Sequence, residues 1–338
     1  MEDTSKRLIP AWVWTILALA GVGLAAAFAL SDRRPEPGRS LEYDVSGYAR
    51  VDASRVCFHE VARQALKLEA PRALCADADG RVFVAGRDAV VALDRDGNET
   101  ARYAVPGTPE CLASGADGRL YVGMQRYILV LDGQGKEMSR WQDLGGRAWL
   151  TSLAAGEDYV YAADAGNRVV LVFDHAGTIT GRIGERDPET GAPGFVVPSP
   201  YFDVMLDASG ALWVVNPGKH GIEHYRPDGT LVSAWYKPGM GLEEFSGCCN
   251  PVHAAIRSDG SLVTMEKGLN RVKLYAPDRS LAGVVAASSG LSLSAAAGQS
   301  CEEDCPVKDL AVDSDGRVLL LHGKRNELIV FEQNGGSA

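Results

Sequence analysis

The chain lacks the short motifs that mark several common enzyme chemistries. Its 338 residues contain no Gly-x-Ser-x-Gly nucleophile elbow, no phosphate-binding Walker loop and no His-Glu-x-x-His zinc motif. They also contain no Cys-x-x-Cys-His, which excludes a covalently attached c-type haem at such a motif. Basic residues are in the minority, 34 against 44 acidic residues, whereas nucleic-acid binding requires a basic surface. We therefore expect no nucleic-acid partner, and no nucleophile–base pair emerges.

Helical periodicity is also absent from the body of the chain, where a strand–turn–strand pattern repeats six times. The six turns are Asp79-Gly80, Asp117-Gly118, Glu157-Asp158, Ser209-Gly210, Asp259-Gly260 and Asp315-Gly316. Their second residues follow one another at intervals of 38, 40, 52, 50 and 56 residues, a spacing typical of propeller blades. A short β-branched or aromatic run follows each turn, and a proline, which cannot donate to a sheet ladder, opens most first strands.

Two segments carry a more specific pattern. Residues 163–177 read Ala-Asp-Ala-Gly-Asn-Arg-Val-Val-Leu-Val-Phe-Asp-His-Ala-Gly, and residues 266–275 read Glu-Lys-Gly-Leu-Asn-Arg-Val-Lys-Leu-Tyr. Both resemble the NHL repeat, and the similarity extends over about residues 70–332. The resemblance implies an all-β, six-bladed β-propeller, which we place at residues 46–334. Such propellers include enzymes as well as binding platforms, so the resemblance does not define a function.

The segment before the first repeat has two predicted roles. We expect part of residues 41–68 to form the outer strand of the last blade, which closes the ring and removes its free edges. Residues 8–30 form an uncharged stretch of 23 residues, which at ~1.5 Å per residue crosses a ~30 Å hydrocarbon core. We predict a short tail at 1–7, a transmembrane helix at 8–30 and a linker at 31–45. A cleavable signal peptide is the alternative, because Ala27-Phe28-Ala29 resembles a cleavage site.

Polar residues stand six positions after four of the turns. They are Asp164, Asn216, Glu266 and His322. The second strand of a blade runs back toward the start of the first, so these residues should surround the mouth of the central channel on one face. His253, near the start of the fifth first strand, should lie in the same place. We predict that these five residues form a face for a ligand or partner. The alternative is that Asp and Asn here cap strand ends and turns, as in the rest of this family.

Four of the seven cysteines lie in the segments that lead into the fifth and sixth first strands. They are Cys248 and Cys249 before one strand, and Cys301 and Cys305 before the next. Since those blades are neighbours, we expect the four sulfurs to converge. Three interpretations are open: disulfides formed in an oxidising compartment, a zinc or iron–sulfur site with these cysteines as ligands, or a redox-active dithiol. The spacing is not the paired Cys-x-x-Cys of a strong zinc motif.

These features favour a membrane-anchored propeller on the extracytoplasmic, periplasmic side of the membrane. Its expected role is to bind or assemble with another envelope or membrane protein. A redox or electron-transfer accessory subunit with a cysteine-ligated site is one alternative. A metal-dependent propeller enzyme of the lyase or lactonase kind is the other, and we lean toward a non-catalytic protein.

Overall fold

The computed structural model describes residues 10, 12–16, 18–20, 22, 46–186, 189, 194–288, 291 and 305–335. The chain divides into two units, Met1–Asp44 and Val45–Ala338. In the first unit, residues 12–16 and 18–20 are helical. No helix among the described residues has the length and apolarity that crossing a membrane requires. The tail at 1–7, the linker at 31–45 and most of the stretch at 8–30 lie outside the described residues, so the anchor stays a prediction.

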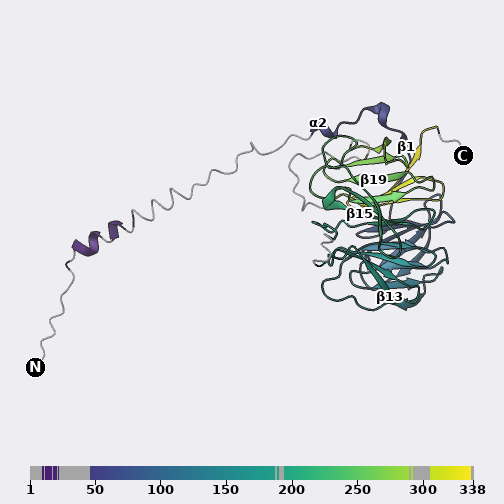
Figure 1. Cartoon of the computed structure of the whole chain (residues 1–338), viewed down its shortest axis with the longest axis horizontal. Coiled ribbons are helices and arrows are strands. Elements are labelled where there is room, and N and C mark those ends of the chain that lie inside the picture. The colour runs from purple at the N-terminus through teal and green to yellow at the C-terminus, as the bar shows by residue number, and fades with distance from the viewer. Residues whose placement is uncertain are drawn as a thin grey trace, which may run out of the picture. The chain divides into compact units, whose positions relative to one another are not determined.

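The second unit is a six-bladed β-propeller of antiparallel four-stranded sheets (Figure 1), preceded by α2 (Ser46–Ala49) and η2 (Ala53–Arg55). Blades 1 and 2 contain β2 (Ala73–Ala76), β3 (Val82–Gly86), β4 (Ala89–Leu93), β5 (Glu99–Ala104), β6 (Cys111–Ser114), β7 (Leu120–Gly123), β8 (Ile128–Leu131) and β9 (Glu137–Arg140). Blades 3 and 4 contain β10 (Leu150–Ala155), β11 (Val160–Asp164), β12 (Val169–Phe173), β13 (Ile179–Ile183), β14 (Val204–Leu206), β15 (Leu212–Asn216), β16 (Gly221–Tyr225) and β17 (Leu231–Tyr236), with η3 (Pro217–Lys219) between β15 and β16. Blades 5 and 6 contain β18 (His253–Ile256), β19 (Leu262–Glu266), β20 (Arg271–Tyr275), β21 (Leu281–Ala286), β22 (Val307–Val312), β23 (Val318–His322), β24 (Glu327–Gln333) and β1 (Phe58–Ala65).

The burial of the strands follows their position in each blade. Most of the second and third strands, such as β11 and β12, are buried along their whole length because neighbouring blades cover both of their faces. The apolar side chains accordingly cluster between adjacent blades, as where the Trp141 ring lies between Tyr121 of blade 2 and Phe173 of blade 3. The turn glycines Gly80 and Gly118 have φ of 81° and 76°, a left-handed conformation that favours glycine. The predicted turns are therefore confirmed.

The ring is closed by the segment that precedes the first blade. β1 pairs with β24 in antiparallel register, so the sheet order of blade 6 is β1-β24-β23-β22. This confirms the expected closure by residues from the 41–68 segment. Phe58 is buried in the cluster that joins blades 5 and 6, with the Arg257 guanidinium 5.8 Å from its ring centroid.

Truncation of Phe58 should weaken this closure. We expect Phe58→Ala to lower the free energy of unfolding by about 3–5 kcal/mol, because it leaves a cavity where the first and last strands meet. Val61 lies on the same strand and is 42% exposed, so Val61→Ala is the matched control and should have little effect. Urea unfolding measures both variants. Equal losses in the two would contradict closure through Phe58.

Candidate functional site

The four predicted polar residues all stand at the ends of second strands, on one face of the propeller. Asp164, Asn216, Glu266 and His322 are the last residues of β11, β15, β19 and β23. This is the face on which the innermost strands begin, as the pairing of Val307 with His322 shows. We call it the lead-in face, and we call the loop before each innermost strand a lead-in loop.

The side chains of these four residues do not line the channel mouth. They are 0–2% exposed, and they turn into their own blades, so the expected open polar ring is wrong in this respect. In blades 3, 4 and 5 the side chain accepts a hydrogen bond from a backbone N–H of its own lead-in loop. The donors are Trp149 N to Asp164 Oδ1, Val196 N to Asn216 Oδ1 and Ser246 N to Glu266 Oε1, each at 3.0 Å. These contacts match the alternative interpretation, in which Asp and Asn cap strand ends and turns. Glu266 makes the same kind of contact.

His322 has a related contact in blade 6. Its Nδ1 accepts a hydrogen bond of 3.3 Å from Arg325 N in the following hairpin, while its Nε2 has no hydrogen-bond partner among the residues that the structure describes. Burial lowers the pKa of this imidazole. His322 therefore holds the hairpin of its own blade.

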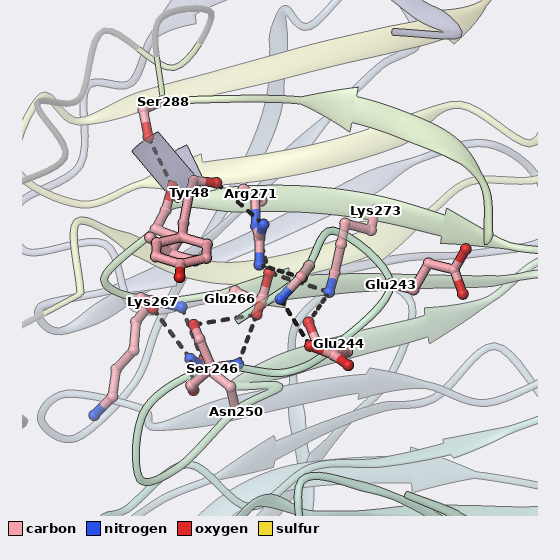
Figure 2. Close-up of polar contacts among 12 residues, drawn as sticks. Tyr48, Glu243, Glu244, Ser246, Asn250, Glu266, Lys267, Arg271, Lys273 and Ser288 are labelled. Atoms are coloured by element: carbon pink, nitrogen blue, oxygen red, sulfur yellow. Dashed lines mark hydrogen bonds and ion pairs between the residues drawn. The ribbon is translucent and has the colours of Figure 1, made fainter. Parts of the chain in front are cut away.

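Glu266 organises the most extensive buried polar network of this face (Figure 2). Its Oε2 lies 2.8 Å from Arg271 Nε and 3.1 Å from Lys273 Nζ, and all three side chains are buried. Two cations face one carboxylate, so backbone carbonyls complete the network. Arg271 Nη2 donates to Gly241 O at 3.1 Å, and Lys273 Nζ donates to Glu244 O at 2.7 Å. The network thereby fixes the lead-in loop of blade 5.

The same network reaches two further parts of the unit. Arg271 Nη1 donates to Tyr48 O in α2 at 3.3 Å. Lys273 Nζ lies 4.3 Å from the ring centroid of Phe245, a cation–π contact. Burial is the main cause that lowers the pKa of Lys273 to about 8, against the attraction of Glu266.

The described cysteines occupy the loops predicted for them. Cys248 is disulfide-bonded, and its Sγ lies 3.3 Å from Sγ of the buried Cys249. Cys305 is also buried, and its N–H donates to the Tyr201 hydroxyl at 3.2 Å. Cys301 lies outside the described residues, so the convergence of all four cysteines stays a prediction.

A disulfide at Cys248 bears on the metal interpretation. Zinc and iron–sulfur clusters bind thiolates, so a disulfide-bonded Cys248 does not fit a four-thiolate set. Across the described ranges of the chain, no three His, Cys, Asp or Glu side chains form a group that could hold a metal ion.

His253 lies at the start of β18, beside two carboxylates that the sequence analysis missed. Its Nδ1 is 3.8 Å from Asp309 Oδ1 and 4.0 Å from Asp203 Oδ2. Burial is the main cause that lowers the pKa of His253 to about 4, so the imidazole is neutral at pH 7. Burial likewise raises the pKa of Asp203 to about 6 and that of Asp309 well above its usual range.

The two carboxylates join neighbouring blades. Asp203 accepts hydrogen bonds from the Ser152 hydroxyl of blade 3 and, at 2.9 Å, from Ala254 N of blade 5. Asp309 accepts one of 2.8 Å from Leu74 N, across the seam between blades 6 and 1. A positional signal was present in the sequence: Asp203, His253 and Asp309 each stand seven residues before the glycine of their blade's turn.

The innermost strands enclose a cavity of about 230 Å³ along the axis. Asp203, Asp309, Ser152, Cys75 and Cys111 are among the residues that line it. Burial raises the pKa of both thiols, so they are protonated at neutral pH. The cavity is smaller than the ~300–1,000 Å³ of typical ligand pockets.

No protein-family model matches the chain, and no curated protein matches it. Its fold is similar to that of solved propeller structures. A streptogramin B lyase aligns with a TM-score of 0.54 at 12% identity, over 84% of this chain and all of the other. A catalytically inactive virginiamycin B lyase from Staphylococcus aureus with quinupristin aligns with a TM-score of 0.53 at 11% identity, over 81% and 99% of the two chains. A protein of unknown function from Bacteroides caccae aligns with a TM-score of 0.51 at 12% identity, over 65% and 82%.

These identities establish the shared fold alone. The six-bladed propeller is therefore confirmed, whereas membership of the NHL-repeat family stays a prediction that no family model supports.

Removal of the Glu266 charge should destabilise the network strongly. Glu266→Gln leaves two buried cations without a carboxylate, so we expect a loss of about 3–5 kcal/mol in the free energy of unfolding. Glu137→Gln, in an exposed ion pair with Arg140, should cost about 0–1 kcal/mol and is the control. Hydrogen exchange at the Ser246 amide should accelerate in Glu266→Gln only. Similar unfolding curves for the two variants would rule out this role.

Lys273 should make stability depend on alkaline pH. Its pKa is about 8 in the folded protein against the usual 10.5, so the unfolded chain binds more protons between these values. Lys273 should then add up to ~1.4 kcal/mol per pH unit to the slope of the free energy of unfolding above pH 8. The raised pKa values of the Cys75 and Cys111 thiols act in the opposite direction, so the contribution of Lys273 is the difference in slope between the wild type and Lys273→Met. Denaturant titrations at pH 7.5 to 9.5 measure this slope. Lys273→Met should lower it, whereas Lys136→Met, in an exposed turn, should keep it; an unchanged slope in Lys273→Met would refute the assignment.

Proposed function

We propose that this protein is a membrane-anchored, extracytoplasmic propeller whose lead-in face binds another envelope or membrane protein. The observation that carries the proposal is that buried side chains of this face fix the lead-in loops by hydrogen bonds to their backbone N–H groups. Trp149 and Val196, whose N–H groups are held by Asp164 and Asn216, are 39% and 41% exposed. Apolar side chains on loops fixed by a rigid scaffold are typical of protein-binding sites, where aromatic residues contribute most of the affinity. Asp164, Asn216 and Glu266 are then positioning residues.

Two features support the location. The uncharged stretch at residues 8–30 has the length of a membrane span. The disulfide at Cys248 agrees with an oxidising compartment, because such bonds are rare where glutathione keeps thiols reduced.

The axial cavity gives less support to catalysis. Asp203 and Asp309 accept hydrogen bonds from backbone N–H groups of adjacent blades, and the neutral His253 lies beside them. This arrangement stabilises the ring, and the cavity of about 230 Å³ is small for a substrate. The lyases that share the fold keep the enzyme alternative open. If the protein turned over a lactone or an amide with saturation kinetics, and a chelator abolished this turnover, the enzyme alternative would replace the docking proposal.

The docking proposal predicts that lead-in loop variants lose the partner. We expect the double variant Trp149→Ala, Val196→Ser to reduce recovery of cross-linked partner from membranes about tenfold or more, since an aromatic anchor contributes roughly 2 kcal/mol. The control is the double variant Val61→Ser, Met138→Ser, which changes exposed apolar residues on β1 and β9. Quantitative mass spectrometry of the cross-linked proteins measures recovery.

Equal recovery in both double variants would exclude the lead-in face. Washing the membranes with carbonate tests the anchor in the same preparation, because release of the full-length chain would contradict it. Metal analysis tests the redox alternative: stoichiometric zinc or iron that is lost in Cys248→Ser and Cys249→Ser would replace the disulfide interpretation by a metal site.

A further inference from the structure

The outermost strands of the six blades are edge strands, and two of them lack charged residues. β1, β5, β9 and β13 each contain Arg, and the first three also contain Glu. β17 (Leu-Val-Ser-Ala-Trp-Tyr) and β21 (Leu-Ala-Gly-Val-Val-Ala) contain no charge. Charged side chains on an edge strand prevent it from pairing with another chain. The uncharged edges are thus the two that can accept a further strand.

The chain covers one of these edges itself. Residue Val56 forms a parallel bridge with Val284 of β21, and Cys57 N donates to Val284 O at 2.9 Å. β17 has no such cover within the described part of the chain, since it ends its sheet and its outer edge pairs with nothing there. Its side chains Leu231, Val232 and Tyr236 are 50%, 48% and 38% exposed.

We propose that β17 pairs in antiparallel register with β17 of a second copy of this chain, about a two-fold axis at Ala234. The direction of the backbone groups sets the register. Lys237 N donates inward, to His220 O, so by the alternation of a strand the N–H and C=O groups of Tyr236 and Ala234 point outward. Two-fold pairing of outward-facing residues places Ala234 opposite its own copy, and this small residue fits at the axis. The register of β17 shifts at Val232, which has no partner in β16, so the regular part of the pairing extends over residues 233–236.

Charge at the two ends of β17 favours a second copy over an unrelated strand. The turn before β17 carries Arg226 and Asp228, and the loop after it carries Lys237 and Glu243. Lys237 pairs with Glu243 of its own loop at 3.2 Å. The two-fold axis therefore brings together a turn and a loop that each carry an acid and a base, so neither end of the pair carries charge of one sign only. The strand itself is neutral, so two chains of formal net charge −10 meet where neither carries charge.

A cysteine at the axis tests this pairing. Directly opposite residues in a hydrogen-bonded antiparallel pair have Cα atoms ~5.5 Å apart, within the range of a disulfide. We expect full-length Ala234→Cys, in mild detergent with oxidised glutathione, to form a covalent dimer on non-reducing gels. Met138→Cys is the matched control, because Met138 is 56% exposed on the charged edge strand β9; it should stay monomeric.

A second measurement does not depend on cross-linking. In analytical ultracentrifugation the wild type and Met138→Lys should approach twice the monomer mass as concentration rises, whereas Ala234→Lys should remain monomeric with unchanged unfolding. A wild type that is monomeric at all concentrations overturns the proposal. So does equal cross-linking of Ala234→Cys and Met138→Cys, which would reflect random collision. Cross-linking of Ala234→Cys to a different protein would assign the edge to that protein and would also overturn it.

Discussion

The lead-in face depends on one kind of contact, a hydrogen bond from the backbone of a lead-in loop to a buried side chain at the end of the second strand. Asp164, Asn216 and Glu266 make it in three successive blades. A lead-in loop has no partner strand at that point, and its N–H would be buried and unsatisfied without this acceptor, which costs ~1–3 kcal/mol. The acceptor therefore sets where the loop runs, and with it where exposed side chains such as Trp149 stand.

Blade 5 extends this contact from a single hydrogen bond to a buried ionic network. Glutamate is longer than aspartate or asparagine, so Glu266 binds Ser246 N with one oxygen and two cations with the other. The cations in turn bind the carbonyls of Gly241 and Glu244. Arg271 and Lys273 share a single carboxylate, so the buried network carries one more positive charge than negative charges. Burial of that charge is costly, and the lowered pKa of Lys273 reflects the cost. Removal of Glu266 alone should therefore lower the free energy of unfolding more than replacement of the whole network by apolar residues of similar volume.

The architecture could be predicted from the sequence because its signals are local. Turn glycines such as Gly80 need a left-handed conformation, and their spacing predicted the six blades. The closing strand β1 was predicted from the segment at residues 41–68 that precedes the first repeat. The orientation of Asp164 or Asn216 could not be predicted in the same way, because it depends on an N–H from the lead-in loop, 15 to 20 residues away in the sequence. The role of Asp203 and Asp309 depends on contacts between blades. Their shared position seven residues before the turn glycine was the one available signal.

The two proposed surfaces use different parts of the propeller, and this separation has a consequence. The lead-in face lies where the innermost strands begin, whereas β17 is the outermost strand of its blade. A partner on the lead-in face and a second copy at β17 can therefore be bound at the same time. A short edge contact buries less area than a stable dimer needs, roughly 1,200 Å² or more in total, so pairing through β17 alone should be weak in solution. Attachment to a common membrane would raise the effective concentration of both copies and of a docked partner. Because the paired β17 strands run in opposite directions, the two lead-in faces point to opposite sides of the pair. Weak pairing at the rim then leaves each face open to its own partner, so a pair of copies would join two partners rather than hold a single one more tightly.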